Sequence, residues 1–96
     1  MNFVALKHSL ENVFQSIKAA TDEAALPSLE DVAQFAKLAQ LLQLQAKEQW
    51  VDEAEDFAHL AAQLLSAVKK SQLEDAVLLV ESLDDAKAYC HRMYQG

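Results

Sequence analysis

Apolar residues recur every three or four positions along most of the chain, a spacing that places them on one face of an α-helix. Short segments interrupt the pattern and divide it into four stretches. The pattern predicts helices over residues 2–20, 28–48, 52–70 and 72–95. Their apolar stripes are Phe3, Leu6, Leu10, Val13 and Ile17, widened by Phe14; Val32, Phe35, Ala39, Leu42 and Ala46; Ala54, Phe57, Ala61, Leu64 and Val68; and Leu79, Leu83, Ala86, Cys90 and Met93.

Capping residues mark the expected helix starts. Pro27 fits the first turn of the second helix, and the hydroxyl of Ser28 can accept a hydrogen bond from the amide of Asp31. Asp52 is the expected cap of the third helix. The run Ser71-Gln72-Leu73-Glu74 has the form of a capping box, which makes Ser71 the predicted N-cap of the fourth helix.

Two helix boundaries allow alternatives. No Gly or Pro separates the second helix from the third, but their stripes are out of phase, so we expect a break near residues 50–52. The alternative is one long helix, which would form a bundle by dimerisation or domain swapping. A second capping box, Ser82-Leu83-Asp84-Asp85, allows a kink or break within the fourth helix.

Four amphipathic helices of similar length with short connections bury their stripes best as an antiparallel up-down-up-down four-helix bundle. We therefore expect an all-α fold with a single domain over residues 1–96. The chain has one Gly and one Pro. This composition argues against sandwiches, barrels and Rossmann-type folds, which need many tight turns.

The net charge of −7 comes from 15 acidic and 8 basic residues. Such a charge repels nucleic acid and anionic membranes, so we expect neither as a partner. No stretch reaches the roughly 18–20 apolar residues of a membrane span, and the chain as given has no leader, so we expect a cytoplasmic protein. The acidic residues gather in first turns, where they complement the helix dipole. The alternative is an acidic face that steers a basic partner.

No catalytic constellation is evident, and we expect no enzyme. Cys90 and His91 are adjacent on a helix, so their side chains diverge by about 100° and cannot act as a catalytic pair. A di-iron bundle needs Glu-x-x-His on two helices. Only one similar run exists, Asp56 to His59, and it begins with Asp.

The last predicted helix carries Cys90-His91, the second half of the c-type haem motif Cys-x-x-Cys-His, with Lys87 at the first Cys position. The segment from Ala88 to Tyr94 resembles the XXXCH domain family, whose short helical domain ends in Cys-His followed by basic and aromatic residues. It resembles the last helix of cytochrome c-prime less closely. The first resemblance implies a small helical bundle without an established activity. The second implies haem on His91, with one thioether bond at Cys90. In our haem hypothesis, Met1 or His8 is a candidate sixth ligand.

From these observations we expect a small non-enzymatic bundle that serves as an interaction or structural module, with a protein partner or a homodimer and no cofactor. The alternative is a haem-binding electron carrier or ligand sensor, in which Cys90 and His91 bind the cofactor and His91 ligates the metal. A third hypothesis is a reactive thiol at Cys90. The remaining alternative is structural: Cys90 is buried in the core and His91 lies on the flank of the helix, so that neither residue belongs to a functional site. Leu44 and Val51 fall off the main stripes, and an exposed apolar patch there would indicate a partner surface.

Overall fold

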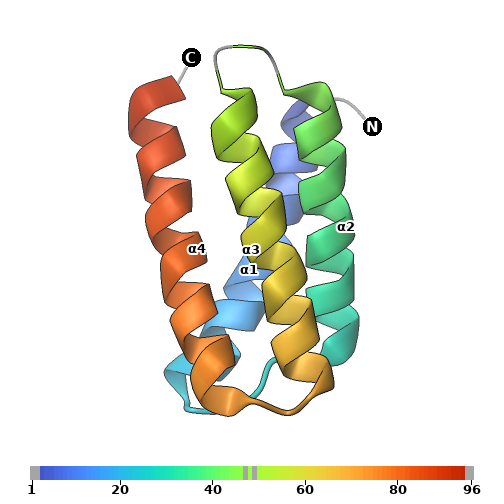
Figure 1. The fold of residues 1–96 in the computed structure, drawn as a ribbon, viewed down its shortest axis with the longest axis vertical. Coiled ribbons are helices and arrows are strands. Elements are labelled where there is room, and N and C mark those ends of the chain that lie inside the picture. Colours follow the sequence, from blue (N-terminus) through green and yellow to red (C-terminus); the bar gives the residue numbers. More distant parts are fainter. Residues whose placement is uncertain (1–2, 47, 49, 95–96) are drawn as a thin grey trace.

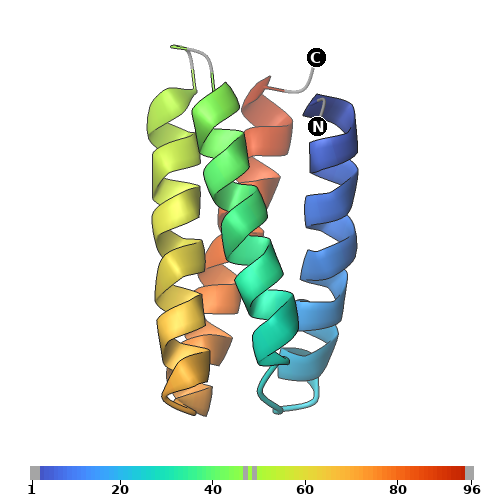
Figure 2. The same ribbon diagram turned by 90° about the vertical axis from the view of Figure 1, so that its right-hand side faces the viewer.

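The computed structural model describes residues 3–46, 48 and 50–94, with the side chains of residues 4–46, 48 and 50–88. This part of the chain forms four helices: α1 (Phe3–Asp22), α2 (Leu29–Gln45), α3 (Val51–Lys69) and α4 (Leu73–Tyr94). They run alternately down and up, as Figures 1 and 2 show. Each packs on the next along the chain, and α4 closes the ring with a lighter contact to α1. The predicted antiparallel four-helix bundle is confirmed.

The helix boundaries settle both open alternatives. Helix α2 ends at Gln45 and α3 begins at Val51, so the expected break is confirmed, although α2 ends three residues earlier than predicted, and the single long helix is wrong. Helix α4 continues through residues 82–85, so the suggested break there is also wrong. Continuity is favoured because Leu83, in the middle of that run, is completely buried in the core.

One of the three predicted caps is present. The Ser28 hydroxyl accepts a hydrogen bond from the Asp31 amide at 3.1 Å, as expected. The N-cap of α3 is Trp50 instead of Asp52, and its side chain makes no capping hydrogen bond. Asp52 lies one residue inside the helix, where its carboxylate complements the positive end of the dipole.

The prediction of Ser71 as a cap is wrong, because Ser71 belongs to the end of α3. Its φ of 56° is left-handed, whereas an N-cap has extended backbone. Its amide donates to the carbonyl of Val68, and the next amide, Gln72, donates to Ala67. These bonds form a Schellman motif. Ala24, with a φ of 57°, closes α1 in the same way.

Both left-handed residues carry a Cβ, so glycine should improve them. We expect Ser71→Gly and Ala24→Gly each to raise the free energy of unfolding by about 1 kcal/mol, because glycine adopts this conformation without the steric penalty. Urea denaturation followed by circular dichroism measures the change. As a control, Ala62→Gly, at an exposed position within α3, should lower it by about 1 kcal/mol. A loss at position 71 or 24 would contradict the argument.

The core is a single cluster to which all four helices contribute. Phe35 of α2 lies at its centre, with ring centroids 5.5 Å from both Phe14 of α1 and Phe57 of α3. The predicted stripe of α3 is buried throughout. In α1, Phe14 is more deeply buried than Val13.

The stripe predicted for α4 is confirmed at Leu83, whereas the most buried face includes other residues than those predicted on either side of it. Ala76, Val80 and Leu83 are buried, whereas the predicted Leu79 and Ala86 are only partly buried. The other predicted members, Cys90 and Met93, lie outside the described side chains, as does Phe3 of α1. The buried residues of α4 follow a step of four and three, and the next position in that sequence is 87.

Candidate functional sites

The predicted Cys90-His91 site lies on the last two turns of α4, at the end of the bundle that also holds the first turn of α1 (Figure 1). The side chains of Cys90 and His91 are outside the described residues. Haem binding, metal ligation by His91 and thiol reactivity at Cys90 therefore stay predictions. Among the described residues, no three His, Cys, Asp or Glu side chains gather to hold a metal ion.

Lys87, at the first Cys position of the haem motif, reaches across the seam between α4 and α1. Its ammonium lies 3.9 Å from the Glu11 carboxylate and 5.6 Å from the centroid of the Phe14 ring. An amine forms no thioether, so the residues present do not fit a haem attached through two thiols. The ion pair is long and partly exposed, so it contributes little by itself, and we expect the aliphatic stem of Lys87 to contribute more than its charge.

A substitution at Lys87 separates packing from charge. We expect Lys87→Met to keep the free energy of unfolding or to raise it by up to about 1 kcal/mol, because an apolar chain of similar length suits a core-facing position. Lys87→Ala should lower it by about 1 kcal/mol, since the cover over Phe14 is lost. Urea denaturation compares the two variants. If Lys87→Met lowers the free energy of unfolding as much as Lys87→Ala, then the charge of Lys87, and not its aliphatic stem, stabilises the contact between α1 and α4.

The same seam contains a second ion pair nearer the other end of the bundle. The ammonium of Lys18 on α1 lies 3.1 Å from the carboxylate of Asp84 on α4. Both side chains are more than two-fifths exposed, so the pair contributes little stability by itself. Charged groups therefore join α1 to α4 at two levels, in keeping with the light contact between these helices.

The histidines of the described residues lie on the surface. His8 and His59 are both exposed, and His59 shares a hydrogen bond of 3.3 Å with Gln63, one turn further along α3. Asp56, the other end of the run compared with a di-iron motif, is also exposed. These positions match a solvated helix face and not ligands directed into the bundle.

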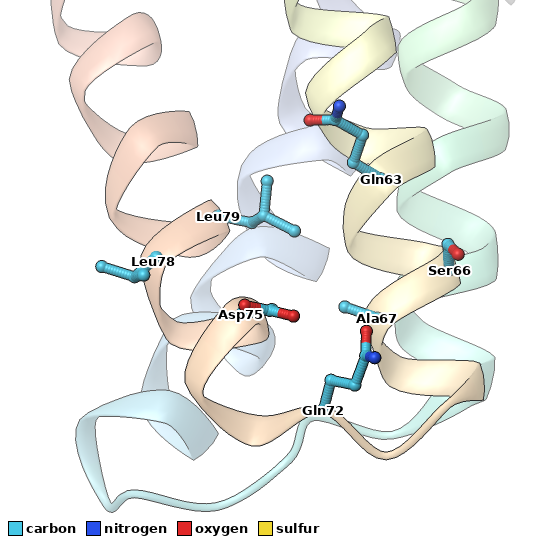
Figure 3. A pocket seen from close by; sticks show the side chains of 7 residues that line it. All are labelled: Gln63, Ser66, Ala67, Gln72, Asp75, Leu78 and Leu79. Atoms are coloured by element: carbon cyan, nitrogen blue, oxygen red, sulfur yellow. The ribbon is translucent and has the colours of Figure 1, made fainter.

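A shallow groove of about 380 Å³ lies between α3 and α4 near the loop that joins them (Figure 3). Gln63, Ser66 and Ala67 come from α3, and Asp75, Leu78 and Leu79 come from α4; Gln72 closes one end. The groove is open to solvent, and its amides, hydroxyl and carboxylate come from exposed positions. Such a surface lacks the enclosure that binds small molecules tightly.

The end of the bundle formed by the α2–α3 loop exposes apolar side chains. Leu44, in the last turn of α2, is 82% exposed, and Val51, at the start of α3, is 36% exposed. Trp50, between the loop and α3, is partly exposed. We call Leu44, Trp50 and Val51 the apolar tip. The expected exposure of Leu44 and Val51 is confirmed.

Three comparisons with known proteins were without a match: no family model, no curated protein and no solved structure resembles the chain significantly. The resemblance to the XXXCH domain and to cytochrome c-prime thus stays a prediction from the motif. Within the described residues, none of the helices combines the length and the apolar character needed to cross a bilayer.

Proposed function

We propose that the protein is a non-enzymatic interaction module that contacts another protein through the apolar tip. The observation that carries this proposal is the 82% exposure of Leu44 at the α2–α3 connection, whose other end holds the partly exposed Trp50 and the exposed Val51. A leucine in the last turn of a helix gains nothing for folding when it faces water, and its burial by a partner is favourable. Aromatic residues within such patches are typical anchors of protein interfaces.

Other features of the surface support this choice. The groove between α3 and α4 is open to solvent, and it mixes polar side chains with Ala67, Leu78 and Leu79. The remaining strongly exposed apolar residues of the described chain lie on three different helices: Val4 in the first turn of α1, Leu29 at the start of α2 and Leu78 on α4. Among the described residues, Leu44 and Val51 are exposed apolar residues on two helices that one short loop joins; Figure 2 shows this loop at one end of the bundle.

Site-specific photo-crosslinking in the native host tests the proposal. A benzophenone amino acid at position 44 should give a discrete adduct with one other protein. The same group at position 78, an apolar position 61% exposed on another face, is the matched control and should give none. Mass spectrometry of the adduct identifies the partner.

Two results would refute this function. Equal adducts from positions 44 and 78 would show unspecific contact, and absence of any adduct from position 44 would remove the tip as an interface. An adduct between two copies of this chain would show that the tip mediates self-association instead of contact with another protein.

A further inference from the structure

We infer that the partner docks a basic amphipathic helix on the apolar tip, an inference that rests on the proposed function. The tip offers exposed apolar side chains, and exposed carboxylates follow them closely along the chain. A helix with a leucine-type anchor and flanking Lys or Arg residues complements both features.

The segment that carries the tip is strongly acidic. Residues 44–56 hold a single lysine, Lys47, and five carboxylates: Glu48, Asp52, Glu53, Glu55 and Asp56. Glu48 lies in the loop, and Glu55 follows Val51 by four residues, so it shares a face of α3 with that apolar side chain. Glu48, Asp52, Glu55 and Asp56 are all exposed.

Only part of this charge is explained by helix formation. Asp52 and Glu53 lie in the first turn of α3, where they complement the dipole. Glu55 and Asp56 lie in the second turn, where the dipole effect has decreased, and Glu48 lies outside the helix. These three carboxylates remain available to a cationic partner.

The charge also argues against a second copy as the occupant. A two-fold interface through the tip would bring each set of carboxylates close to the equivalent set. Like charges facing each other across an interface are unfavourable. An anionic membrane surface is disfavoured for the same reason.

Trp50 provides a local reporter, because it is the only tryptophan in the chain and belongs to the tip. We would titrate the full-length protein with a tryptophan-free amphipathic helical peptide of leucine and lysine and record the Trp50 emission. The matched peptide replaces every lysine by glutamate and keeps the leucines. We expect saturable binding and a shift in emission with the lysine peptide alone, and weaker binding as salt rises.

Variants assign the binding to the tip. Leu44→Gln should weaken it at least about tenfold, because the apolar anchor is lost. Leu78→Gln, at an exposed leucine on α4, should leave it unchanged. Glu48→Gln, Glu55→Gln and Asp56→Asn together should weaken binding and reduce its salt dependence. Circular dichroism of each variant checks that its thermal midpoint is retained.

The two proposals fail in different ways. Equal binding of both peptides, no binding of the lysine peptide, or a tenfold loss with Leu78→Gln would overturn the basic helix, while a crosslink from position 44 would still support an interaction module. A larger emission shift with zwitterionic lipid vesicles than with the lysine peptide would assign the tip to a lipid surface and refute both. Concentration-dependent dimerisation that Leu44→Gln abolishes would assign it to a second copy.

Discussion

Replacing Phe35 by alanine should lower the free energy of unfolding by about 3–5 kcal/mol, the largest effect that we expect from a single truncation in this chain. Phe35 is 1% exposed, and its ring contacts both Phe14 and Phe57 at centroid separations of 5.5 Å. The alanine variant loses the buried ring area, leaves a cavity and breaks two aromatic contacts. A domain of this size is stable by roughly 5–14 kcal/mol, so the loss is a large share of the total.

Two companion variants show whether the ring itself is responsible. Phe35→Leu keeps much of the apolar volume but removes both ring contacts, so it should lose about 1–2 kcal/mol. Leu78→Ala truncates a side chain that is 61% exposed and should change stability by less than about 0.5 kcal/mol. Urea denaturation of all three variants gives the comparison. Similar losses for Phe35→Ala and Leu78→Ala would contradict the description of the core.

The fold could be predicted from the sequence because apolar residues recur at the three- and four-residue spacing of a helix over most of the chain. The α3 stripe from Ala54 to Val68 was predicted residue by residue, and all of it is buried. In α4, Leu83 was predicted and is buried, but Ala76 and Val80 were missed because two apolar ridges compete on that helix. The buried one, Ala76, Val80 and Leu83, continues to Lys87, and a charged residue at a core-facing position obscured the correct choice.

The turn between α3 and α4 shows a different limit. The run Ser71 to Glu74 fits a capping box, but the chain must also reverse direction within a few residues. A left-handed residue ends α3, and with no glycine in this segment Ser71 takes that conformation. A local capping pattern does not reveal whether a turn residue ends the preceding helix or begins the following one.

The candidate sites were predictable to different degrees. The exposure of Leu44 and Val51 follows from their helical phase, so the tip could be anticipated. The contact of Lys87 with Glu11 and Phe14 could not, because it depends on how α4 is rotated against α1. The role of Cys90-His91 depends on chemistry that two adjacent residues do not specify.

Enlarging Ala61 should destabilise the core although the change is conservative. Ala61 is completely buried in α3, the helix that packs most extensively on α2, and its methyl group allows close approach of the helices. We expect Ala61→Leu to lower the free energy of unfolding by about 1–3 kcal/mol, because added methylenes force neighbouring side chains from their rotamers. Helix propensity does not explain such a loss, since alanine and leucine are both strong helix formers.

The next residue supplies a matched control for this steric argument. Ala62 is exposed on the same turn of α3, so Ala62→Leu adds the same atoms where solvent can accommodate them. It should change stability by less than about 0.5 kcal/mol in the same urea denaturation. Equal tolerance of leucine at positions 61 and 62 would contradict this argument. It would show that the helices can move apart without loss of stability, and that the core around the completely buried Ala61 is not tightly packed. A large difference between the two positions would instead show that small side chains within α3 fix the distance at which the bundle closes.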